Sequence, residues 1–142
     1  LDVDISVFLG QKTRDRKEFD DIKFLNALYI DNYIVLFFRK GDVRKFLKNG
    51  KDIIDEMKRK FRANIMLVEH HHNLREFIEG LFYPVPVTAI NVVWLPDGSM
   101  ETRIILGRRM GRKRGEIEKR AEIASKIAKK VKNVEVKVEY LR

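Results

Sequence analysis

The same order of strand and helix patterns occurs twice along this chain, and that repeat limits the possible folds more than any single motif. In the first half, the β-rich runs Lys23–Ile30 and Tyr33–Arg39 are separated by the hairpin signal Asp31-Asn32. In the second half, Val87–Leu95 and Met100–Leu106 flank a Pro-Asp-Gly-Ser turn. We therefore expect one β-hairpin in each half of the chain.

Helix patterns and a closing strand follow each hairpin. In the first half these are a short helix capped by Asp42, the break Lys48–Lys51, a longer helix and the strand Asn64–His70. The second half opens with a helix capped by Asn73 and, after its hairpin, continues with a break at Gly111, a helix over about Glu116–Lys130 and the strand Val134–Tyr140. The breaks at Lys48 and Gly111 are 63 residues apart. The sequence therefore predicts two small α/β units, residues 1–72 and 73–142.

Two segments lie outside this simple repeat. Asp2–Leu9 alternates apolar and polar residues and predicts an N-terminal strand, followed by the weakly helical run Thr13–Ile22. Phe82–Val87 is dense in apolar residues, whereas flexible linkers are rich in glycine, serine or charge. We expect Phe82–Val87 to form an ordered junction between the two halves.

Positive charge is concentrated in the last quarter of the chain. Residues 107–142 hold 13 Lys and Arg against 5 Asp and Glu, a net of +8, whereas residues 1–106 hold 17 against 16. A local excess of this kind is the electrostatic footprint of a polyanion partner. A membrane surface could use the same charge, but apolar anchors are not evident, and no apolar run reaches the ~20 residues of a membrane span. The absence of cysteine from the sequence suits a reducing cytosol, so we expect a cytoplasmic protein.

The basic stretch from Gly107 to Gly115 is the strongest candidate binding site. Glycine lets a ligand approach the backbone closely, arginine and lysine supply charge and donors, and a helix pattern begins immediately afterwards. The candidate residues are Arg108, Arg109, Gly111, Arg112, Lys113, Arg114 and Gly115, with Lys119 and Arg120 widening the positive field. We expect a phosphate backbone to lie here, although a basic loop in solvent is the simpler alternative.

The repeated plan, with a tight glycine-containing break between two helices, resembles a type II KH domain. The tandem resembles the KH pair of archaeal NusA-like transcription factors. The similar pieces are Lys40-Gly41-Asp42, Leu67–His70 leading to Leu74–Ile78, and the Pro84–Val87 crossover into Ala89–Val93. The resemblance implies an α+β fold of two fused KH-like modules, each a small three-stranded sheet packed by helices. It also implies a groove that clamps about four nucleotides of single-stranded RNA.

The loops depart from the Gly-x-x-Gly pattern of the family. The first module has Lys48, Asn49, Gly50 and Lys51, so a single glycine is left, and the second replaces the last glycine by Arg114 and offers Gly115 one place later. A missing glycine adds a Cβ that holds the sugar–phosphate chain away and should weaken the clamp. The added cations can restore affinity through charge, with less defined geometry.

The remaining candidates carry less weight. Three consecutive imidazoles at His70–His72 cannot all face one ion, so a strand–helix junction is favoured over a metal site. Trp94 could stack on a base, but packing against a helix is the commoner outcome. Phe37 and Phe38 are adjacent on a strand, so one of them should face away from the core and could face RNA. The sequence contains no nucleophile–base pair, phosphate-binding loop or dinucleotide fingerprint, and we expect neither catalysis nor a cofactor.

The sequence therefore predicts a non-enzymatic protein that binds single-stranded RNA, mainly through its second module. The resemblance implies a nascent transcript as the RNA, transcription termination or elongation as the process, and RNA polymerase as a possible partner. The alternative is a KH-shaped protein–protein adaptor that no longer binds RNA, with its basic tail against an acidic partner.

Overall fold

The structure is a computed structural model that describes residues 2–83, 85–107 and 114–141. The chain divides into two compact units, Leu1–His71 and His72–Arg142, and each has its own three-stranded sheet. The first unit consists of α1 (Val3–Thr13), the short 3-10 helix η1 (Lys17–Phe19), β1 (Phe24–Ile30), β2 (Tyr33–Phe38), α2 (Asp42–Asn49), α3 (Lys51–Phe61) and β3 (Asn64–Glu69). The second consists of α4 (Leu74–Phe82), β4 (Val87–Trp94), β5 (Met100–Leu106), α5 (Arg114–Lys132) and β6 (Val136–Tyr140).

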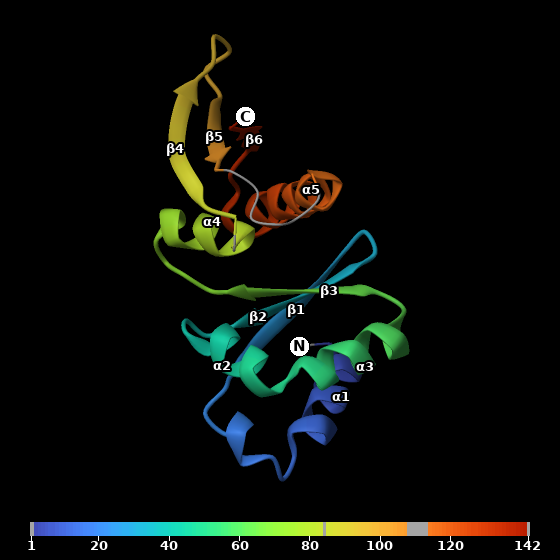
Figure 1. The fold of residues 1–142 in the computed structure, drawn as a ribbon. Coiled ribbons are helices and arrows are strands. Elements are labelled where there is room, and N and C mark those ends of the chain that lie inside the picture. Colours follow the sequence, from blue (N-terminus) through green and yellow to red (C-terminus); the bar gives the residue numbers. More distant parts are fainter. Residues whose placement is uncertain (1, 84, 108–113, 142) are drawn as a thin grey trace. The chain divides into compact units, whose positions relative to one another are not determined.

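Both sheets have the same topology. The strand orders are β1-β2-β3 and β4-β5-β6, with an antiparallel hairpin followed by a parallel third strand in each. A register shift falls between Phe24 and Asn26 in one hairpin and between Val87 and Ala89 in the other. These positions differ by the same 63 residues as the two basic breaks. Helices cover one face of each sheet (Figure 1). The fold is thus α+β with two KH-like modules of type II topology, which confirms the predicted fold class.

Aromatic side chains fill the core of the first unit. Phe46 of α2 is fully buried and contacts Phe19, Phe24 and Phe38 at ring-centroid distances of 5.4, 5.6 and 5.4 Å. These rings come from four different elements, so η1, β1, β2 and α2 converge on one cluster. Burying aromatic rings makes a large hydrophobic contribution to the stability of the unit.

The N-terminal segment is a helix, and the predicted strand over Asp2–Leu9 is wrong. Asp2 caps α1 because its carboxylate accepts from the backbone N–H groups of Asp4 and Ile5, at 2.9 and 3.4 Å. Ile5, Phe8 and Leu9 are buried at helical spacing, whereas Val3 and Val7 are exposed. The spacing of Ile5 and Leu9 is compatible with the two-residue period of a strand as well as with a helix. Packing of α1 against α3 favours the helix.

Phe82–Val87 lies inside the second unit, so the prediction that it joins the two halves is also wrong. It connects α4 to β4, and Val85 is buried with its N–H donating to the carbonyl of Phe82 at 2.8 Å. The boundary between the units falls at His71–His72 instead. The chain is ordered on both sides of this boundary, because the His70 N–H bonds to the Phe38 carbonyl and Asn73 caps α4.

Candidate nucleic-acid interface

The loop of the first unit is a one-residue turn between two helices. α2 ends at Asn49 and α3 begins at Lys51, so Gly50 belongs to the ends of both. Its N–H donates to the carbonyl of Phe46 at 2.7 Å, and its carbonyl accepts from Ile53 and Ile54, each at 3.1 Å. Lys48, Asn49 and Lys51 are exposed around this turn. Two of the predicted cations therefore lie at the surface, beside the helix junction.

Packing explains the glycine at position 50. Its φ of −107° lies in a region that any residue can adopt. An added Cβ, however, would lie 2.7 Å from the backbone oxygen of Phe46 and 2.8 Å from its ring. Gly50 therefore lets the turn close onto the buried ring of Phe46, and the structure gives it this role independently of any ligand.

Arg16, which sequence reasoning missed, occupies the same loop. Its guanidinium donates to the backbone carbonyl of Asn49 at 3.0 Å and to the carboxylate of Asp52 at 3.1 Å. A third bond joins Arg16 Nε to Glu18 at 2.9 Å, and this bond raises the pKa of Arg16 above its ordinary value. The guanidinium also lies 4.6 Å from the centroid of the Phe19 ring. The N-terminal extension thus places one of the chain's own cations on the first loop.

Asp42 organises the start of α2 differently from the prediction. Gly41, with φ of 90°, stands at the N-cap, and the Asp42 carboxylate instead accepts from the Lys23 N–H at 2.9 Å. Arg39 pairs with this nearly inaccessible carboxylate at 3.2 Å, while Glu69 accepts from the Val43 N–H at 3.2 Å. The family-like Lys40-Gly41-Asp42 segment therefore ties the hairpin to α2, which is a structural role.

The loop of the second unit falls largely outside the described part of the chain. The predicted site residues Arg108, Arg109, Gly111, Arg112 and Lys113 lie outside the described residues, and of Arg114 only its place at the start of α5 is described.

The two flanks of this loop are well defined. Gly107 is buried at the end of β5, with its N–H donating to the Pro86 carbonyl at 2.7 Å, and an added Cβ would lie 2.8 Å from the Pro86 ring. Gly115 is exposed in the first turn of α5, and an added Cβ there would meet no described atom within 4 Å.

The two α5 cations have different surroundings. Lys119 is exposed and lies 3.7 Å from Glu122. Arg120 is half-buried, and its Nε donates to the carbonyl of Leu81 at 2.9 Å. Leu81 is in the last turn of α4, where carbonyls lack partners within the helix. Arg120 therefore joins α5 to α4, and Lys119 is the cation that stays at the surface.

The structure overturns two expectations about aromatic residues. Trp94 is 70% exposed, so the prediction that it packs against a helix is wrong. Phe37 and Phe38 expose 3% and 0%, so neither presents a surface to RNA. Within residues 2–83, 85–107 and 114–141 no group of three or more His, Asp or Glu could hold a metal ion. No helix in those same ranges is long and apolar enough to cross a bilayer.

Comparison with known proteins supports the fold alone. No protein-family model and no curated protein matches this chain. Among solved structures, it is similar to one titled "Crystal structure of APE1850", with 20% sequence identity and a TM-score of 0.66. The alignment covers 96% of this chain and 94% of that chain. The likeness therefore spans both units, and not one module alone.

Proposed function

We propose that this protein binds single-stranded RNA without catalysing a reaction, and that its second unit supplies most of the affinity. The observation that carries the proposal is the sheet topology of a type II KH module, present twice. The basic stretch of residues 107–115 lies between β5 and α5. The first unit has its α2–Gly50–α3 turn at the matching place in the topology. In KH domains that place is where the sugar–phosphate chain is clamped.

Two observations favour the second unit over the first. Arg16 already bonds to the Asn49 carbonyl and the Asp52 carboxylate, so part of the first loop is taken up by the protein itself. Residues 72–142 hold 15 Lys and Arg against 9 Asp and Glu, a net of +6, whereas residues 1–71 hold 15 against 12, a net of +3. Phosphate contacts dominate affinity for nucleic acids, so the more basic unit should bind more tightly.

The biological setting follows from the resemblance to archaeal NusA-like factors. By this resemblance, the bound RNA is a nascent transcript, the process is transcription termination or elongation, RNA polymerase is a partner, and the location is the cytoplasm. A protein–protein adaptor that has lost RNA binding is the second candidate, and the occupied first loop favours it.

Paired charge reversals test the proposal. Arg112→Glu with Lys113→Glu should reduce affinity for a short single-stranded RNA much more than Lys48→Glu with Lys51→Glu. The two double variants change net charge equally, so a difference in affinity reports which loop binds the RNA. For every phosphate that is no longer neutralised, the slope of log K against log salt should also fall by roughly 0.7. Titrations at several salt concentrations measure both quantities.

Equal losses of affinity in the two double variants would contradict the assignment to the second unit, and no RNA binding by the parent would favour the adaptor. Gly111→Val adds a geometric test at unchanged charge. A β-branched side chain should block close approach of the sugar–phosphate chain and weaken binding. A folded Gly111→Val variant that binds as well as the parent would rule out a KH-type clamp.

A further inference from the structure

Three apolar side chains are exposed together at the end of the β4–β5 hairpin. Val92, Trp94 and Met100 expose 55%, 70% and 51% of their surface. Trp94 lies directly opposite Met100, and Val92 lies opposite the buried Thr102. Residues paired in this way share one face of a sheet. Trp94 therefore faces the helix-covered side, at the end of a hairpin that extends beyond the helices of its unit (Figure 1).

A lysine-lined depression lies on the same side of the sheet. Its volume is about 350 Å³, and it is lined by Ser125, Lys126, Lys129, Lys130, Glu135 and Val136. Lys129 pairs with Glu135 at 2.7 Å, and Lys126 pairs with Glu122 at 3.9 Å. These side chains are about half exposed, and exposed ion pairs contribute little to stability. A phosphate oxygen can therefore replace the carboxylates at small cost.

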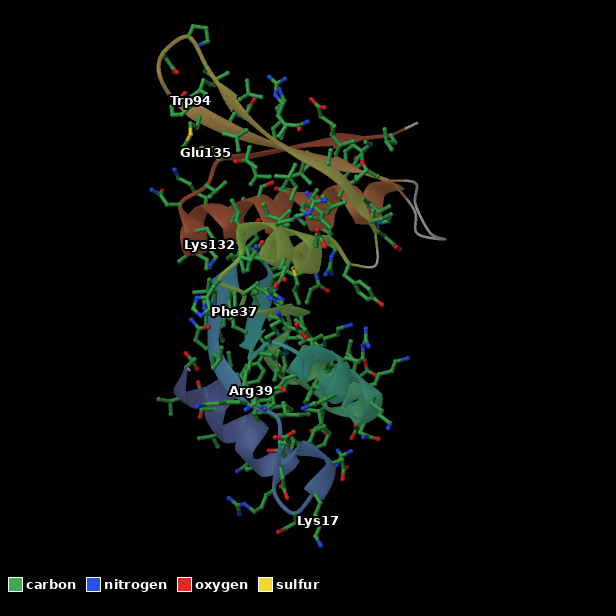
Figure 2. The ribbon with its side chains drawn as sticks, turned by 90° about the vertical axis from the view of Figure 1, so that its left-hand side faces the viewer. Lys17, Phe37, Arg39, Trp94, Lys132 and Glu135 are labelled. Atoms are coloured by element: carbon green, nitrogen blue, oxygen red, sulfur yellow. The ribbon has the colours of Figure 1, made fainter. Side chains whose placement is uncertain are left out.

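The depression and the exposed tryptophan are neighbours. The Thr102 N–H donates to the Glu135 carbonyl at 2.8 Å. Thr102 is two residues along β5 from Met100, the partner of Trp94, so the edge of the depression lies close to that pair. Strand spacings of ~4.8 Å and a rise of ~3.4 Å per residue put the backbones of Trp94 and Glu135 about 10 Å apart. Figure 2 shows Trp94 and Glu135 at the same end of the second unit, with Lys132 at the end of α5.

We propose that this surface is a second contact for single-stranded RNA, with a base stacked on Trp94 and phosphates held by Lys126, Lys129 and Lys130. An aromatic platform beside a cationic groove is the combination that binds single strands irrespective of sequence. The inference rests on the proposed function and extends it. α5 has 19 residues, which corresponds to roughly 28 Å. The depression adjoins the C-terminal half of α5, and the basic loop precedes its N-terminus. A short RNA bound at the loop would therefore not reach Trp94.

The first unit offers an internal comparison. At the same 63-residue offset, the position of Trp94 is held by Asp31, which lies in the tight turn between β1 and β2. In the second unit the turn is longer, and the hairpin carries an indole where the first carries a carboxylate. The longer hairpin with its exposed tryptophan thus belongs to the more basic of the two units.

Trp94 is the single tryptophan of the chain, so its fluorescence reports on this surface alone. The intact protein is titrated with fluorescein-labelled oligouridylates of 4 and 20 nucleotides. Anisotropy of the label measures binding, and indole emission measures stacking. We expect the 20-mer to quench the indole, and Trp94→Ala to weaken 20-mer binding roughly 10-fold, within the range of base–aromatic stacking. The 4-mer, bound at the loop, should be affected much less.

Two further variants separate stacking from charge. Trp94→Phe should retain most of the affinity, and Tyr83→Ala, which removes an aromatic residue of similar exposure (69%) from the same unit, should leave 20-mer binding unchanged. Lys129→Glu with Lys130→Glu should reduce both the affinity and the quenching.

The outcomes distinguish this inference from the proposed function. If the 20-mer binds without quenching, and Trp94→Ala binds it as well as the parent, the second contact is wrong and RNA binding at the loop stands. If the anisotropy of neither labelled RNA changes when protein is added, the proposed RNA binding and this contact are both wrong. Equal quenching by polyglutamate would show a surface for acidic polypeptides and would overturn the RNA contact.

Discussion

At the scale of single residues, the glycines of this chain divide by what surrounds them. Gly50 is packed so closely on Phe46 that a methyl group would lie 2.7–2.9 Å from its carbonyl and ring. Gly10, in the middle of α1, has no described atom within 4 Å of an added Cβ. One glycine is therefore required by the core, and the other only weakens a helix.

This contrast gives a stability prediction. Gly50→Ala should destabilise the protein by ~1–3 kcal/mol, because the methyl group overpacks the turn against Phe46. Gly10→Ala should stabilise it by ~0.5–1 kcal/mol, because alanine is the better helix former. Urea unfolding of the parent and both variants measures the difference. A neutral Gly50→Ala would contradict the assignment of Gly50 to packing against Phe46.

At the scale of elements, neighbouring cations on α5 have different roles. Arg120 reaches the Leu81 carbonyl of α4, whereas Lys119 is exposed beside Glu122. Sequence reasoning placed both in one positive field, since they are adjacent basic residues on a helix. Their orientation about the helix axis separates them, because consecutive residues on a helix point about 100° apart.

Methionine substitutions test this division. Arg120→Met should lower the free energy of unfolding by ~1–2 kcal/mol, since it removes a charged hydrogen bond that caps the last turn of α4. Lys119→Met removes the same charge and should change stability by less than about 0.5 kcal/mol. RNA titrations should show the larger loss of affinity for Lys119→Met. If Arg120→Met folds with parental stability but binds RNA poorly, Arg120 is a binding residue and the structural assignment is wrong.

At the scale of the whole molecule, the duplicated topology predicts a duplicated pattern of hydrogen exchange. β2 and β5 are the central strands of their sheets and are paired on both sides. Their amides should exchange most slowly in each unit, and the outer edges of β1 and β4 much faster, because a single neighbouring strand protects them. Exchange followed by NMR measures this order directly. Faster exchange in β5 than in β4 would contradict the strand order of the second sheet.

The sequence by itself determined the repeat, the two hairpins and most helix and strand positions. These depend on local spacing and turn chemistry, as with Asn73, which caps α4 as expected. The sequence also located the basic stretch around Gly111, because the charge of a segment can be counted directly from its residues.

The tertiary structure alone decided which candidate residues lie at the surface. Val3–Leu9 is helical because Ile5 and Phe8 pack into the core. Trp94 is exposed on a long hairpin, and Arg16 contacts a loop 33 residues away. Burial and long-range hydrogen bonds depend on which elements meet in space, and the period of a segment carries no information about its distant neighbours.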